Sequence, residues 1–197
     1  PFLAFRQFER ERGLPADFLR GINARNHDDN AWARFERSEL SPHEFDEVFA
    51  AETRAAGHEV HGLDVIDLLY GEVRPAMVAA LKACKRHFTN ACVTNNVAAE
   101  PRRGFGRDRG RAGEWKGILD LFDVVIESSR IGVRKPEIRF FERACEQLGI
   151  TASQAVYLDD LGTNLKPARA MGMRTIKVED PAIAIADLES VLEISLH

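Results

Sequence analysis

Polar residues that could do chemistry follow two short apolar runs of this sequence. Asp159 and Asp160 end one run, and Thr94, Asn95 and Asn96 follow another. Two adjacent carboxylates repel each other, so a cation or hydrogen bonds must offset the cost of placing them together. A bound Mg²⁺ would do so. The alternative is that an aspartate caps the helix that comes next, where the helix dipole favours a negative charge.

A third candidate, Lys135, precedes Pro136, a residue that can open a helix at its first turn. Its ammonium would then lie near the positive end of that helix, where it could neutralise a phosphoryl group and an attacking carboxylate. The alternative is a solvated surface lysine. Thr94 offers a hydroxyl and a backbone amide that could hold a phosphoryl oxygen, or it could simply end a strand in a turn.

The elements that would position these residues begin after Gly71, where short apolar strands alternate with helices. This order predicts an α/β fold with a parallel sheet covered by helices on both faces. Ligands of such sheets bind beyond the carboxyl ends of the strands, which is where the polar residues lie. The expected strands are 91–94, 124–126, 156–158 and 175–178, and the expected helices are 75–86, 136–148 and 161–171.

The first part of the chain has a helical pattern throughout. Phe2, Phe5 and Phe8 recur at a spacing of three, and Ser41 with Glu44 fits a capping box at the start of a helix. We therefore predict two domains, a helical one over residues 1–70 and an α/β one over residues 71–197. Between the first two strands, residues 98–113 should form a long surface loop. The loop contains Arg102, Arg103, Arg107, Arg109 and Arg111, which could steer a phosphorylated substrate or could be only a solvated surface.

The composition of the chain limits the classes of partner and the compartment that we expect. Of the 197 residues 45% are hydrophobic and 29% are charged, and the net charge is -4, which gives no general attraction to nucleic acid. No apolar run is long enough for a membrane span and no leader opens the chain, so we expect a cytoplasmic protein. Cys84, Cys92 and Cys145 lack metal-ligand spacing, which favours free thiols in a reducing compartment. Oligomerisation is left open.

Three segments, taken in their order along the chain, match the pattern of a known family. Residues 92–96, 132–136 and 156–164 resemble motifs two, three and four of the haloacid dehalogenase (HAD) superfamily. The segment 157–178 looks particularly like the phosphatase domain of mammalian-type soluble epoxide hydrolases. The resemblance implies a Rossmann-like core with a helical cap inserted after the first strand. It also implies hydrolysis of a small phosphorylated substrate, an organic or lipid-like monoester, through an aspartyl-phosphate.

The same resemblance implies the role of each candidate residue. Thr94 and Asn95, with Asn96 beside them, would hold the phosphoryl group, Lys135 would balance charge, and Asp160 with Asp159 would bind Mg²⁺. The adjacent aspartates favour a phosphatase over a dehalogenase, which needs no Mg²⁺.

The sequence departs from the family pattern at the nucleophile. No apolar strand ending in Asp-x-Asp precedes the helical region, and the first aspartate, Asp17, is expected to be a loop or helix-cap residue. The first strand of this family is central, so its absence would leave two inner edges unpaired at roughly 1 to 3 kcal/mol per buried backbone group. We therefore expect the natural polypeptide to be longer. The rival interpretation is a non-catalytic binding or regulatory module that has lost its nucleophile.

Overall fold

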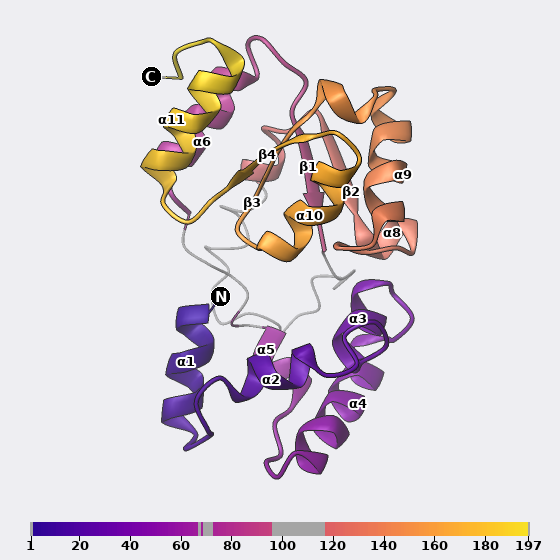
Figure 1. Ribbon diagram of the computed structural model, residues 1–197. Coiled ribbons are helices and arrows are strands. Elements are labelled where there is room, and N and C mark those ends of the chain that lie inside the picture. The colour runs from indigo at the N-terminus through magenta and orange to yellow at the C-terminus, as the bar shows by residue number, and fades with distance from the viewer. Residues whose placement is uncertain (1, 67, 69–72, 96–116, 197) are drawn as a thin grey trace.

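The structure is a computed structural model that describes residues 2–66, 68, 73–95 and 117–196. Helices form the N-terminal part and lie below the α/β part in Figure 1. The described residues before position 69 contain no strand. The helices there are α1 (Phe2–Glu11), α2 (Phe18–Ala24), α3 (Ala31–Glu36), α4 (Pro42–Ala55) and α5 (Gly62–Ile66).

Local sequence signals set the starts of these helices. Ser41 and Glu44 form the expected capping box at α4, with Pro42 in the first turn. Asn30 caps α3 by accepting the amide of Ala33. Asp17 occupies the N-cap position of α2, so the expectation that it is a loop or cap residue is confirmed.

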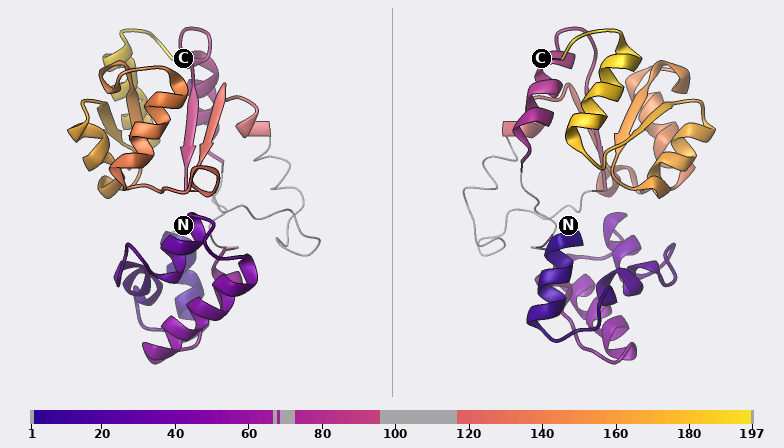
Figure 2. Two further views of the ribbon diagram at one scale, coloured as in Figure 1. Left: turned by 90° about the vertical axis from the view of Figure 1, so that its right-hand side faces the viewer. Right: turned by 60° about the vertical axis from the view of Figure 1, so that its left-hand side comes forward.

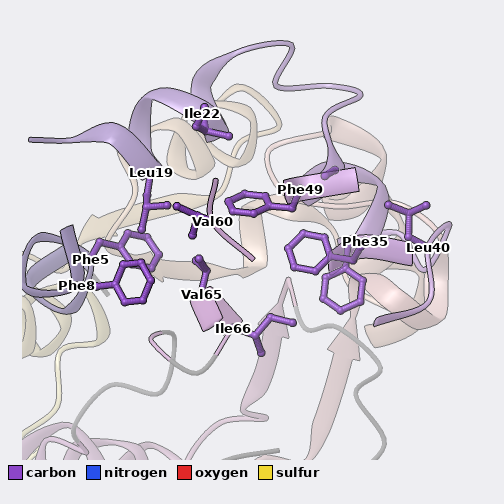
Figure 3. Close-up of a cluster of buried hydrophobic side chains, with 12 residues drawn as sticks. Phe5, Phe8, Leu19, Ile22, Phe35, Leu40, Phe49, Val60, Val65 and Ile66 are labelled. Atoms are coloured by element: carbon purple, nitrogen blue, oxygen red, sulfur yellow. The ribbon is translucent and has the colours of Figure 1, made fainter. Parts of the chain in front are cut away.

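One apolar core holds the N-terminal helices together, and Figure 3 shows its side chains converging from separate elements. Phe45 is fully buried; its ring stacks on Phe35 at 4.3 Å between centroids and meets the edge of Trp32 at 5.1 Å. Aromatic pairs in these arrangements add about 0.5–1.5 kcal/mol beyond the area that they bury. The ring of Phe45 is therefore held from several sides.

Gly62, at the start of α5, lies directly against this ring. A Cβ added at Gly62 would lie 2.5 Å from Cε1 of Phe45. Because the ring cannot move without disturbing its neighbours, we expect Gly62→Ala to lower the free energy of unfolding by about 1–3 kcal/mol, the usual cost of overpacking.

Gly21 provides the matched control, because a Cβ there would meet nothing within 4 Å inside helix α2. Gly21→Ala should stabilise the protein by up to about 1 kcal/mol through helix propensity. Urea denaturation of both variants tests the pair. Equal midpoints for the two would contradict the packing argument.

The described residues of the α/β part form four short strands, and the predicted α/β class with parallel strands is confirmed. They are β1 (Ala91–Thr94), β2 (Val124–Glu127), β3 (Val156–Asp159) and β4 (Arg174–Lys177). All pairings are parallel. The first three strands begin at their expected residues, whereas β4 begins and ends one residue earlier than expected.

Helices cover the strands on two faces (Figures 1 and 2). On one face α9 (Ile138–Leu148) and α10 (Gly162–Ala170) pack against Ile126 and Tyr157. On the other face α6 (Pro75–Cys84) and α11 (Pro181–Leu192) pack against Ile176. Side chains alternate along a strand, so β3 serves both cores: Tyr157 faces α9, whereas Val156 and Leu158 face α6 and α11.

The strands form two separate pairs rather than the single sheet that the sequence predicts. In the described residues β1 pairs with β2 and β3 pairs with β4, and no ladder joins β1 to β3. All four residues of β1 are only half-buried, although inner strands of parallel sheets are normally buried on both faces. Residues of both pairs nevertheless contribute to one core with Phe140 and Phe141, so the pairs lie side by side.

Several helix boundaries differ from the expectations: α6 ends at Cys84 rather than at residue 86, and α10 spans Gly162–Ala170 rather than 161–171. Helix α9 begins at Ile138, not at Pro136, because the amide of Glu137 closes a turn on the carbonyl of Arg134. Helix α11 was not among the expected helices, although Asp180 caps it and Pro181 opens it. Within the described part of the chain no helix has the length and hydropathy needed to cross a membrane.

Candidate active site

The side chain of Lys135 lies at the carboxyl end of β3 rather than in solvent. Its Nζ is 2.8 Å from Oδ2 of Asp159, and the two side chains are only 11% and 6% exposed. The alternative of a solvated surface lysine is therefore wrong. The ammonium contacts Asp159, and the following helix, α9, begins three residues after Lys135.

Asp159 is surrounded by hydrogen-bond donors from its own strand and from α10. Its Oδ1 accepts the Leu161 amide at 2.8 Å, Asn164 Nδ2 is 3.1 Å from both oxygens, and the hydroxyl of Tyr157 donates to Oδ2. Burial opposes the charge, but Lys135 and these donors outweigh it and lower the pKa of Asp159. A carboxylate has about four lone-pair sites, so protein donors already occupy this one.

Tyr157 is positioned by strand geometry and by packing. It lies two residues before Asp159, so both side chains point to the same face of β3. Burial and then the hydrogen bond to Asp159 raise the pKa of Tyr157, which keeps its hydroxyl protonated as a donor. The ring also packs edge-on against Phe141 at 5.3 Å between centroids.

Asn95 connects the end of β1 to the loop that carries Lys135. Its Oδ1 accepts the backbone amide of Lys135 at 2.8 Å, and its Nδ2 donates to the carbonyl of the same residue at 2.9 Å. The side chain of Asn95 thus binds both backbone polar groups of Lys135, its N–H and its C=O. A carboxamide at this position fits that pattern because it supplies a donor and an acceptor together.

The remaining expected residues differ in exposure. Asp160 is exposed beside the buried Asp159, and Thr94 is half-buried at the end of β1, where it pairs in register with Glu127 of β2. Asn96 and the arginines between positions 102 and 111 lie outside the described residues.

Sequence reasoning missed Glu36, at the end of α3. Its Oε2 accepts from Nε of Arg134 at 2.5 Å and from Nδ2 of Asn95 at 3.1 Å. No local pattern marks this residue, because its partners are 98 and 59 positions away. Tyr157 could have been found, since alternation along a strand places it on the side of Asp159.

The side chains near Asp159 and Asp160 supply only some of the oxygen ligands that a Mg²⁺ ion needs. Among the described residues no group of three or more histidine, cysteine, aspartate or glutamate side chains is arranged to hold a metal ion. However, Mg²⁺ often binds through one or two carboxylates and takes its other oxygens from water and phosphate. The exposed carboxylate of Asp160 fits that mode of binding.

Comparison with known proteins identifies the family. A sequence model of the haloacid dehalogenase-like hydrolases matches residues 4–172. The chain belongs to this family. Its relatives include bifunctional epoxide hydrolase 2 of Mus musculus, which is 31% identical over 199 residues that cover 95% of this chain and 35% of that protein. The chain thus spans about a third of that relative's length.

Two further comparisons concern a phosphatase and the fold. A sesquiterpene phosphatase of Aspergillus oryzae is 25% identical over 163 residues, which cover 82% of this chain and 79% of that protein. The solved structure of a putative HAD-hydrolase, YfnB from Bacillus subtilis bound to magnesium, superposes with a TM-score of 0.61. It covers 98% of this chain and 90% of that one at 18% identity, which shows a shared fold.

Proposed function

We propose that this HAD-like hydrolase is a Mg²⁺-dependent phosphatase that acts on a small organic or lipid-like phosphate monoester. The observation that carries the proposal is the buried ammonium of Lys135, which the clamp of Asn95 and the carboxylate of Asp159 hold at the strand ends. A phosphoryl group carries close to two negative charges, so a fixed cation there stabilises the charge that moves during transfer. The phosphatase among the relatives supports this reaction class.

The two adjacent aspartates would then have different roles. Asp159 anchors Lys135, because its oxygens already accept several protein donors. Asp160, whose side chain is exposed, would contribute an oxygen ligand to Mg²⁺. The sequence predicted that both aspartates bind the metal; we now propose that Asp160 alone does so. Bound Mg²⁺ would neutralise negative charge on the substrate, and the magnesium in the YfnB structure supports its use in this fold.

Thr94 and the ammonium of Lys135 would contact the phosphoryl group. The ammonium has three N–H donors and Asp159 takes one of them, which leaves two for phosphoryl oxygens. The hydroxyl of Thr94 would add a neutral donor. The side chain of Asn95 is engaged with the Lys135 peptide, so we assign it to positioning rather than to direct phosphate binding.

The nucleophile would come from a strand between β1 and β3. Each of these strands pairs on one side only in the described part of the chain, and β1 is half-exposed along its length. A parallel strand inserted there would join the two pairs into one sheet. An aspartate at its carboxyl end would lie between Thr94 and Asp159 and could form the aspartyl-phosphate.

The N-terminal helices would act as the cap that selects the leaving group. We assign residues 1–70 to the cap and residues 71–197 to the core. The assignment is supported by contacts of α3 with the residues that follow the strands. One of them is the hydrogen bond that Ser128 Oγ, at the start of the short helix α8 (Ser128–Ile131), donates to the carbonyl of Glu36 at 2.7 Å.

A metal-removal assay tests this function. The full-length natural protein should hydrolyse a generic aryl phosphate when Mg²⁺ is present, and EDTA should abolish the turnover. Residues 1–197 alone should show no turnover, because the proposed nucleophile is not among them. Turnover by residues 1–197 that EDTA does not affect would overturn the mechanism. Absence of turnover in the full-length protein would favour a non-catalytic binding module.

A further inference from the structure

The end of helix α3 contacts the loop that carries Lys135 at several points, although the two segments are about a hundred residues apart. The carboxylate of Glu36 accepts from Arg134 at 2.5 Å, and Arg37 Nη1 is 3.5 Å from Oε1 of Glu137. Arg134 also donates to the carbonyl of His27 at 3.1 Å. Side chains of the cap thus hold the residues on both sides of Lys135 and Pro136.

Glu36 also contacts the clamp on Lys135 itself. Its Oε2 accepts from Nδ2 of Asn95, the same nitrogen that donates to the carbonyl of Lys135. Its Oε1 accepts from the indole of Trp32 at 3.0 Å. One buried carboxylate therefore binds a cap side chain, the strand-end residue Asn95 and the loop residue Arg134.

A contribution to stability alone does not explain why the carboxylate of Glu36 is buried here. Burial raises the pKa of Glu36 even though Arg134 and the hydrogen bonds oppose the shift, so its desolvation is incompletely offset. Buried ion pairs are often no more stabilising than apolar residues of similar volume, and they can serve instead to fix one arrangement. The side chains of Glu36 and Arg134 are 10% and 12% exposed, so solvent screens the pair little.

We propose that Glu36 is a positioning residue: it closes the cap onto the core and, through Asn95 and Arg134, holds the Lys135 loop so that the ammonium stays at the strand ends. The inference rests on the proposed phosphatase function, since it assigns the cap a role in forming the same site. Lys135 is then fully ordered only when the cap is closed.

The test replaces Glu36 by glutamine in the full-length protein. All side-chain partners of this carboxylate are donors, so the amide nitrogen of glutamine would face a donor in either orientation. Hydrogen exchange at the Lys135 amide, which donates to Asn95 Oδ1, reports the clamp directly. Its exchange rate should rise about tenfold in Glu36→Gln, because loss of a charged partner releases the network. Turnover of aryl phosphate should fall by a similar factor, with KM little changed.

Two further variants control the test. Glu52→Gln alters a half-buried cap carboxylate that accepts the Ala31 amide at the other end of α3, and it should leave Lys135 exchange unchanged. Glu36→Asp retains the charge, and its exchange rate at the Lys135 amide should lie between those of the unaltered protein and Glu36→Gln. This variant provides the test if Glu36→Gln does not fold.

The outcomes separate this inference from the proposed function. Unchanged Lys135 exchange in both Glu36 variants would overturn the inference, whether or not the protein is a phosphatase. A uniform rise in exchange over the whole chain would also overturn it, because it would indicate only a structural role. Absence of turnover in the unaltered protein would overturn the phosphatase proposal and leave the exchange test intact.

Discussion

Replacing Lys135 by alanine in the full-length protein is expected to lower turnover of a phosphate monoester about 100- to 1000-fold while Mg²⁺ stays bound, the usual effect of removing one fixed electrostatic partner of a transition state. Mg²⁺ should stay bound because the ammonium of Lys135 contacts Asp159, whereas the proposed metal ligand is the exposed carboxylate of Asp160, which the substitution leaves in place. Asp160→Asn should instead weaken the binding of Mg²⁺. Turnover and calorimetric Mg²⁺ titration of both variants measure the difference.

The alanine variant also leaves Asp159 buried without its cation, which can cost about 3–5 kcal/mol of stability. The double variant Lys135→Ala with Asp159→Asn removes that unpaired charge, so its thermal stability should recover while its turnover stays low. Lys85→Ala is the matched control. Lys85 pairs with Asp123 at 3.2 Å at the opposite end of the strands, and its loss should leave turnover unchanged. Full turnover in Lys135→Ala would refute the charge-balancing role.

Replacing Phe141 by alanine is expected to lower the free energy of unfolding by about 3–5 kcal/mol, the range found when large aromatic side chains are removed from cores. Phe141 is 1% exposed and packs between Phe140 and Tyr157, with centroid distances of 5.7 and 5.3 Å. Because Tyr157 donates to Asp159, the cavity would also loosen a side chain that anchors Lys135.

Urea denaturation followed by circular dichroism measures this cost. Phe141→Leu should give a smaller loss, because leucine fills part of the cavity. Ile138→Ala, on the same helix but 47% exposed, should change the free energy of unfolding by no more than about 0.5 kcal/mol. Similar losses at positions 138 and 141 would show that the core packing is not as described.

The sequence by itself determined the positions of the strands and the residues that follow them. Short apolar runs bounded by polar residues are local signals, and the residues after a parallel strand must lie at its carboxyl end. This is why Thr94, Asn95 and Asp159 could be assigned to one edge before the structure was known. The capping box at Ser41 was equally local, since its hydrogen bonds span three residues.

Only the tertiary structure decided how the site residues divide their tasks. Asp159 and Asp160 are chemically identical in the sequence, but the strand turns one into the core beside Tyr157 and Lys135 and leaves the other exposed. The role of Glu36 depends on the packing of α3 against loops far along the chain, and no periodic pattern encodes such a contact. Periodicity reports which face of an element is buried, whereas the partner of each side chain depends on how separate elements pack together.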